Sequence, residues 1–141
     1  PQKIKGFHSP NGKWSIALLR MLKKFNYKYD VISSKRETSF KPFQYALPYI
    51  NNTVRLYTIG DDWGLYQKDK NSEKAYNYFK SLYDKIQIGD LAGIGFHPWV
   101  LYSDNAILEG FEMFLTYLSE QHDVQIKTGF EYISGIEKLG D

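Results

Sequence analysis

The sequence predicts an α/β fold of parallel strand–helix units that forms an incomplete (β/α) barrel. Short apolar segments typical of strands alternate along the chain with amphipathic segments typical of helices. We expect about five parallel strands and about four flanking helices, whereas a closed barrel of this kind needs about 250 residues. The 141 residues would therefore build only part of such a barrel. An open α/β sheet with helices on both faces is the alternative fold.

The first predicted strand covers residues 3–7 and ends at the turn residues 9–12. A helix follows over residues 16–25, because apolar residues recur there in steps of three and Ser15 can cap them. Residues 28–32 form the second predicted strand. The apolar stripe of the helix consists of Ile16, Leu19, Leu22 and Phe25.

The middle of the chain begins with residues 33–52, which lack a clean period and contain two prolines, so we expect mostly loop there. Residues 54–59 alternate in polarity and predict a third strand. A second helix follows residues 71–72, and a turn at residues 89–90 leads into a strand over residues 91–96. The stripe of this helix consists of Ala75, Phe79, Leu82 and Ile86.

The last part of the chain predicts a helix that starts near Asp104, a strand over residues 124–127 and a helix over residues 131–139. No internal repeat, low-complexity segment or linker divides the sequence. We therefore expect residues 1–141 to form a single unit. Because the sequence starts at Pro1 rather than at a methionine, we also expect that further residues precede it.

Composition excludes several function classes. The formal net charge is +2 and no run of four Lys or Arg occurs, which argues against a nucleic-acid partner. No apolar run approaches the ~18 residues of a membrane helix, so no membrane partner is expected. Without cysteine the chain has neither disulfides nor thiolate metal ligands, so cysteine usage does not indicate its cellular compartment. The 12 Tyr, 9 Phe and 3 Trp indicate either an aromatic core or a surface that binds sugar rings.

Polar side chains gather where the predicted strands end. In parallel β/α architectures, catalytic groups lie at the carboxyl ends of strands, which share one rim. The polar residues at these positions are His8, Asp30, Asp61, Asp62 and His97. The tripeptide Gly-Phe-His occurs at both histidines, each time with a proline close behind. Trp14, Trp63 and Trp99 each follow such a strand end, so the indole rings would share the same rim.

Each of these residues also has a structural interpretation. A histidine beside a proline is commonly a structural hydrogen-bonding group, and an Asp-Asp pair commonly caps a loop through an Asx-turn. The indole rings can serve packing as well as sugar binding. His122 lies near the end of a predicted helix, where we expect it to be structural. Two histidines and an aspartate could bind a metal, but no His-x-x-x-His pair occurs, so we expect no metal site within this chain.

The order of these motifs resembles the polysaccharide deacetylase superfamily (NodB homology, carbohydrate esterase 4). Residues 6–14 and the helix and strand after them are similar to the family's Arg-x-Pro-aromatic-Gly motif and its surroundings. Leu47-Pro48-Tyr49, Leu56-Tyr57 and Asp61-Asp62-Trp63 look like the approach to its Asp-Trp element. Residues 94–99 resemble the late motif that carries the general acid, and residues 124–131 the closing strand and helix.

The resemblance implies a distorted barrel that removes N- or O-acetyl groups from amino sugars, assisted in the complete enzyme by a divalent metal such as zinc. His97 would be the general acid, with His8 and Asp62 as further catalytic residues. The resemblance also implies five residues that contact the substrate, which are Pro10, Gly12, Trp14, Trp63 and Trp99. The family's aspartate pair and its His-x-x-x-His pair would lie upstream, so this chain would be the C-terminal portion of the barrel.

Two departures from the family pattern keep other interpretations open. His8 stands where the family has an arginine, and Asn11 replaces an aromatic residue. Histidine lacks the permanent planar charge and five donors of arginine. The alternatives are therefore a carbohydrate-binding relative without catalysis and a small metal-binding or scaffolding α/β domain without a sugar role. We also expect open strand edges to pair with the missing N-terminal half or with a second copy of the chain.

Overall fold

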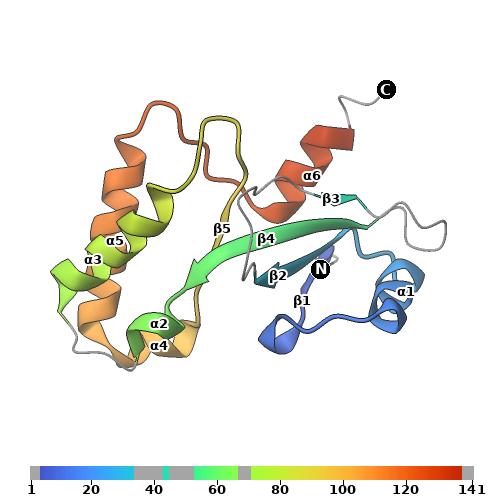
Figure 1. Cartoon of the computed structure of the whole chain (residues 1–141), viewed down its shortest axis with the longest axis horizontal. Coiled ribbons are helices and arrows are strands. Elements are labelled where there is room, and N and C mark those ends of the chain that lie inside the picture. Colours follow the sequence, from blue (N-terminus) through green and yellow to red (C-terminus); the bar gives the residue numbers. More distant parts are fainter. Residues whose placement is uncertain (1–3, 34–42, 45–52, 67–70, 138–141) are drawn as a thin grey trace. The chain divides into compact units, whose positions relative to one another are not determined.

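The computed structural model describes residues 4–33, 43–44, 53–66 and 71–137 and shows an α/β fold, with a mainly parallel sheet flanked by helices (Figure 1). The chain divides into two compact units, which are described separately. Unit 1 comprises Pro1–Thr58 and Ile126–Asp141, and unit 2 comprises Ile59–Gln125. Whether residues 1–141 act as a single domain of a larger barrel stays a prediction.

Unit 1 holds the beginning of the sheet. Its elements are β1 (Gly6–His8), η1 (Pro10–Gly12), α1 (Ile16–Lys24), β2 (Tyr29–Ser33), β3 (Phe43–Gln44), the start of β4 (Val54–Asp61) and α6 (Gly129–Glu137). β1 pairs with β2 and β2 with β4, both in parallel, whereas β3 runs antiparallel to β4. The order β1-β2-β4 with a helix between the first two strands is compatible with part of a β/α barrel.

A buried ion pair joins the two central strands of unit 1. Asp30 on β2 lies opposite Arg55 on β4, and their side chains are 3% and 6% exposed. Arg55 donates from Nη2 to Oδ2 over 2.6 Å and from Nε over 3.2 Å. The ring of Trp14, which follows η1, lies 4.8 Å from the guanidinium carbon of Arg55. A loop beyond β1 is therefore held on the sheet by a cation–π contact.

Helices α1 and α6 pack on this sheet through different contacts. Leu19 and Leu22 of α1 are buried against partly buried neighbours that include Phe7. α6 approaches β2 closely, because a Cβ at Gly129 would lie 2.7 Å from the ring of Tyr29. A reciprocal capping box starts α6: Thr128 donates its backbone N–H to Glu131 over 2.7 Å, and the Glu131 N–H donates to the Thr128 hydroxyl over 3.2 Å.

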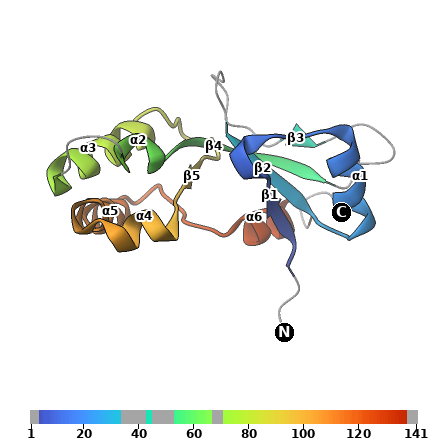
Figure 2. The same ribbon diagram turned by 90° about the horizontal axis from the view of Figure 1, so that it is seen from below.

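Unit 2 is built around two helices that pack on each other. Its elements are the end of β4, α2 (Trp63–Tyr66), α3 (Ser72–Tyr83), β5 (Gly93–Gly95), α4 (Pro98–Ser103) and α5 (Asn105–Ser119). β5 pairs with β4. Figure 2 shows α2 with α3 on one side of the unit and α4 with α5 on the other. A Cβ at Gly110 would lie 2.5 Å from that of Ala75, so α3 and α5 come too close there for any larger residue.

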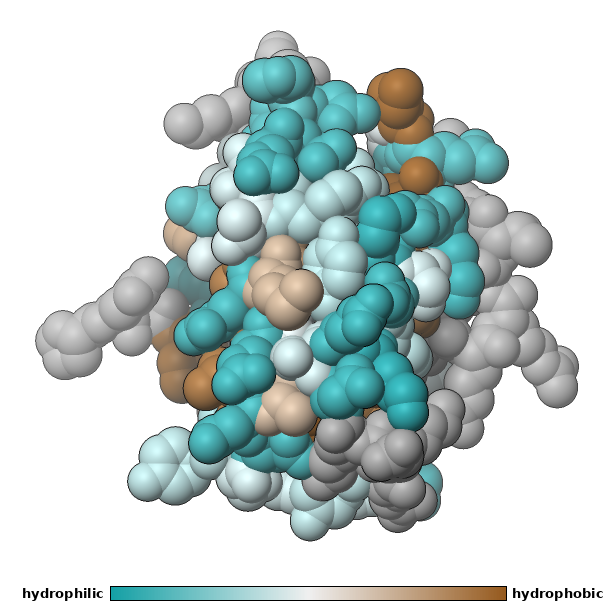
Figure 3. Space-filling view, turned by 90° about the vertical axis from the view of Figure 1, so that its left-hand side faces the viewer, coloured by the Kyte–Doolittle hydropathy of each residue, from teal (hydrophilic) through white to brown (hydrophobic). Residues whose placement is uncertain are grey.

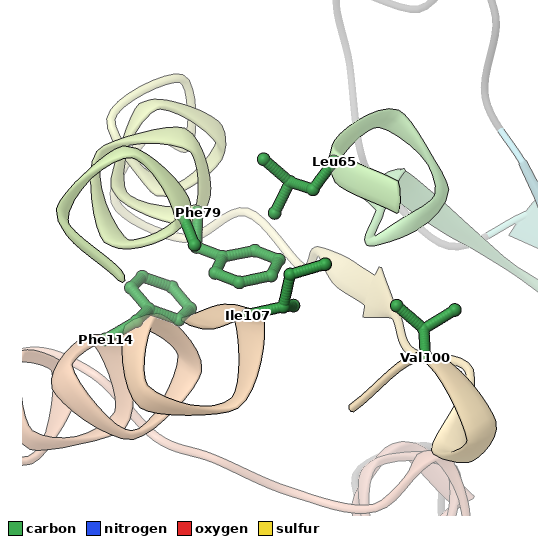
Figure 4. Packing of buried hydrophobic residues seen from close by; sticks show 6 residues of the cluster. Leu65, Phe79, Val100, Ile107 and Phe114 are labelled. Atoms are coloured by element: carbon green, nitrogen blue, oxygen red, sulfur yellow. The ribbon is translucent and has the colours of Figure 1, made fainter. Parts of the chain in front are cut away.

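The core of unit 2 lies among its helices, and Figure 4 shows the side chains of Phe79, Ile107 and Phe114 pointing toward one another. It consists of Leu65, Ala75, Phe79, Val100, Ile107 and Phe114. The rings of Phe79 and Phe114 pack at a tilt of 31°, with their centroids 5.9 Å apart. The outer side of the two helices is mostly hydrophilic in Figure 3, as expected for amphipathic helices. No helix in the described ranges is both long and apolar enough to span a bilayer.

Helix α5 begins at a residue that it shares with α4. Asp104 ends α4 and caps α5, since its carboxylate accepts hydrogen bonds from the N–H groups of Ala106 (3.1 Å) and Ile107 (3.2 Å). Asn71 caps α3 and Ser15 caps α1 in the same way. The three predicted helix starts at these positions are confirmed.

Other predictions from the sequence need correction. The strand predicted over residues 124–127 is wrong, because this segment has no regular structure and Ile126 is 68% exposed. Four alternating residues cannot form a strand without a neighbour to pair with. The strand predicted over residues 91–96 is shorter, the first strand starts later than predicted, and the short helices α2 and α4 were not anticipated. Most of the loop predicted over residues 33–52 lies outside the described residues.

Removing the carboxylate of Asp30 is expected to destabilise unit 1. Asp30→Ala leaves the buried guanidinium of Arg55 without this partner, and we expect the free energy of unfolding to fall by about 3–5 kcal/mol. Asp84→Ala is the control, because it removes the exposed pair with Lys80 and should have little effect. Urea unfolding monitored by circular dichroism measures both changes. Equal unfolding midpoints for the two variants would contradict a stabilising role of the buried pair.

The capping box of α6 predicts a pH dependence of stability. Hydrogen bonds from the backbone and side chain of Thr128 lower the pKa of Glu131 below 4.5. Because this pKa is lower in the folded state, the contribution is complete above about pH 4.5 and is lost as the pH falls through the folded value. Glu131→Gln should abolish this part of the acid-induced change in urea midpoint, whereas Glu112→Gln on exposed α5 surface should preserve it. An acid response of Glu131→Gln identical to that of the wild type would refute this.

Candidate functional site

The ends of β4 and β5 bring an aspartate and a histidine together in unit 2. β4 ends at Asp61 and β5 at Gly95, so Asp62 and His97 follow the two strands within two residues. The backbone N–H of Asp62 donates to the carbonyl of Gly95 over 3.3 Å, which ties the strand ends to each other. The two segments then turn directly into α2 and α4 (Figure 1).

Asp62 holds His97 through both of its carboxylate oxygens. Oδ2 accepts the backbone N–H of His97 over 2.8 Å, and Oδ1 lies 2.5 Å from the ring nitrogen Nδ1. The side chain of Asp62 is completely buried, whereas that of His97 is 40% exposed. A carboxylate accepts hydrogen bonds, so Nδ1 carries the proton and Nε2 is the nitrogen left for proton exchange with a ligand. This is the arrangement of an oriented acid–base histidine.

Two indole rings lie against the imidazole ring, and a tyrosine packs on both indoles. The ring centroids of Trp63 and Trp99 lie 6.0 and 5.8 Å from that of His97, and 5.9 Å from each other. Tyr66 stacks on Trp63 at 5.6 Å and meets Trp99 edge-on at 5.0 Å. Trp63 and Trp99 are 46% and 48% exposed. The pair Asp62–His97 therefore stands beside an exposed aromatic surface, which we call the indole surface (Trp63, Tyr66 and Trp99).

The two adjacent aspartates have different surroundings. Asp61 accepts the backbone N–H of Trp63 over 3.2 Å through Oδ1, the Asx-turn that the sequence left open. Its carbonyl accepts the hydroxyl of Tyr78 over 2.9 Å. Burial, and secondly the charge of Asp61, raise the pKa of Tyr78 above 10.0. Of these two aspartates, only Asp62 accepts hydrogen bonds from His97.

Sequence reasoning missed Tyr66 and Tyr78. Tyr78 lies three residues after Ala75 and four before Leu82, so the helical stripe that predicted α3 also placed this ring on the inner side. That signal was available. Tyr66 follows Trp63 by three residues, but the four-residue helix α2 that makes them neighbours has no periodic pattern in the sequence.

The remaining predicted site residues belong to unit 1. His8 ends β1 and is exposed, Pro10 and Gly12 form η1, and Trp14 contacts Arg55. Of the predicted set, unit 2 brings together Asp62, Trp63, His97 and Trp99. The expectation that His8 shares a rim with Asp62 and His97 stays a prediction. His122 lies in a turn beyond the end of α5 and is exposed.

The family that the sequence resembles uses a divalent metal. Among the residues that the structure describes, no group of three or more His, Asp or Glu side chains could hold one. Asp62 and His97 are a pair, and each uses the facing atoms to bind the other. Two side chains are fewer than the three protein ligands of a catalytic metal site, so no step of the chemistry proposed below passes through a metal.

Exchanging Asp62 for its amide should disturb the imidazole. In Asp62→Asn one of the two oxygens that accept from His97 becomes an NH₂ group, which is a donor and cannot accept a hydrogen bond. We expect the free energy of unfolding to fall by about 1–3 kcal/mol. The ¹⁵N shifts of the His97 ring should move because the proton on Nδ1 loses its acceptor. Asp61→Asn retains an acceptor for the Trp63 N–H and serves as the control. Unchanged ring shifts in Asp62→Asn would show that this carboxylate does not set the tautomer.

Comparisons with known proteins give no relative for this arrangement. No family model, curated protein or solved structure matches the chain. The site is therefore described by its own geometry: a buried carboxylate, an oriented and half-exposed imidazole, and an aromatic surface beside it.

Proposed function

We propose that this chain takes part in the hydrolysis of acetyl groups on the amino sugars of a polysaccharide, as the C-terminal portion of a deacetylase-type barrel. His97 would donate a proton to the leaving group, with Asp62 holding the ring. The observation that carries this proposal is the pair of hydrogen bonds from His97 to the buried Asp62, beside two half-exposed indoles. The order of the sequence motifs supports the same function.

The chemistry assigned to His97 is the second half of the reaction. After water has attacked the acetyl carbonyl, the bond from carbon to the sugar nitrogen or oxygen breaks and acetate forms. The leaving atom needs a proton at that moment, and Nε2 of a protonated imidazole supplies it. Because Nδ1–H stays bound to Asp62, the ring keeps its orientation while the Nε2 proton moves. Histidine suits this task because its charge changes near neutral pH.

The indole surface supports a carbohydrate as the substrate. Trp63 and Trp99 meet at 72°, so their exposed parts present two differently oriented apolar walls beside His97. Flat aromatic rings match the C–H faces of sugar rings, while polar groups nearby bind the hydroxyls. That His8, Pro10, Gly12 and Trp14 of unit 1 contact the same substrate stays a prediction from the sequence. The catalytic base and any metal are not assigned to this chain.

A carbohydrate-binding relative without catalysis is the second candidate. It is favoured by His8, which stands where the resemblance implies an arginine that orients the base. Histidine cannot reproduce a permanent, planar cation with five donors. The indole surface does not depend on that arginine, so sugar binding would persist where hydrolysis is lost.

Replacement of His97 tests the catalytic proposal. In the complete protein we expect His97→Ala to lower the release of acetate from N-acetylated chitooligosaccharides by about 10²-fold or more. His122→Ala should release acetate at the wild-type rate, because this exposed histidine lies in a turn after α5. Turnover by His97→Ala equal to that of the wild type would refute the acid role.

Tryptophan fluorescence distinguishes the two candidates. Chitooligosaccharide should change the emission under both, and Trp99→Ala should reduce that change. If the complete wild-type protein changes its fluorescence with the sugar but releases no acetate, the carbohydrate-binding relative without catalysis is favoured. If neither signal responds to the sugar, both candidates are wrong.

A further inference from the structure

We propose that Tyr78 on α3 is a positioning residue for the Asp62–His97 pair and that it acts through the peptide group between Asp61 and Asp62. The hydroxyl of Tyr78 does not touch His97. It fixes the backbone from which Asp62 extends. The structural part of this inference stands on the geometry of unit 2, and only its effect on turnover rests on the proposed function.

One peptide group is held at both of its ends. Its carbonyl oxygen, which belongs to Asp61, accepts the hydroxyl of Tyr78 over 2.9 Å. Its N–H, which belongs to Asp62, donates to the carbonyl of Gly95 over 3.3 Å. Because a peptide group is planar, fixing both ends sets the orientation of the whole plane. The Cα of Asp62 lies in this plane, so the point from which its side chain extends toward His97 is fixed.

Two glycines allow this close assembly. A Cβ at Gly64, in the first turn of α2, would lie 3.0 Å from the hydroxyl oxygen of Tyr78. A Cβ at Gly95 would lie 3.2 Å from the Cβ of Asp61. Both distances are shorter than ordinary contacts between non-bonded carbon and its neighbours. A Cβ at position 64 would therefore require the hydroxyl of Tyr78 to shift slightly, which alters its hydrogen bond to the carbonyl of Asp61.

The surroundings of Tyr78 preserve it as a donor. Burial raises its pKa, and the negative charge of Asp61 adds to this effect. A phenolate could not donate to a carbonyl, so both influences maintain the hydrogen bond. The next residue, Phe79, is fully buried in the core of unit 2. Tyr78 thus connects the placement of Asp62 with the packing of α3 on α5.

Two variants break the contact from opposite sides. Tyr78→Phe removes only the hydroxyl, whereas Gly64→Ala retains it and displaces it. Tyr83→Phe is the matched control, because Tyr83 also lies on α3 but its ring packs against Tyr117 at 5.7 Å. The ¹H and ¹⁵N signals of the His97 ring are recorded for each variant of the 141-residue chain, with Asp62→Asn as the reference for a disturbed ring. Thermal unfolding checks that each variant is folded.

We expect Tyr78→Phe and Gly64→Ala to shift the His97 signals and Tyr83→Phe to leave them in place. In the complete protein, kcat for acetate release should fall by about 10- to 100-fold in both variants with little change in KM, since the proton donor is misplaced while the indole surface persists. If Tyr78→Phe does not fold, Gly64→Ala carries the same comparison with the tyrosine intact.

The outcomes separate this inference from the proposed function. Unchanged His97 signals in folded Tyr78→Phe or Gly64→Ala overturn the positioning role, as do equal shifts in Tyr83→Phe. If the variants shift the His97 signals but the complete wild-type protein releases no acetate, the positioning role stands and the proposed hydrolase function is wrong.

Discussion

A carboxylate that has no contact with water must find its hydrogen-bond donors within the protein, and Asp62 finds both of them in His97. This requirement ties the end of β4 to the end of β5 and gives the imidazole one orientation. The indole surface follows from it, because Trp63 is the next residue after Asp62 and Trp99 comes two residues after His97. The pair thus joins the turns into α2 and α4, together with the hydrogen bond from the Asp62 N–H to the carbonyl of Gly95.

Much of this site could be predicted from the sequence, because polar residues after parallel strands converge for topological reasons. Asp62 and His97 were identified in that way, and the caps Ser15, Asn71 and Asp104 have local chemical signatures. The helical stripe places the ring of Tyr78 on the inner side of α3, but its hydrogen bond to the carbonyl of Asp61 could not be predicted, since it depends on how far α3 lies from the backbone of β4. The wrong strand over residues 124–127 has the same origin: its alternation is local, whereas pairing requires a neighbour.

Unit 1 shows how an aromatic residue near a strand end can have a structural role. Trp14 was expected to contact substrate, and its ring is 52% exposed. The covered part of the ring lies over Arg55, which in turn binds Asp30 on the neighbouring strand. Guanidinium groups and sugars both stack on indoles, so the sequence position alone does not separate the two roles.

The carboxylate of Asp104 has a consequence for how this chain can vary in length. Asp104 closes α4 and opens α5, and it is the single residue between the two helices. One residue inserted there would turn the apolar stripe of α5 by about 100° relative to the helix that carries Trp99. The interval from His97 to Ile107 should therefore tolerate insertions poorly.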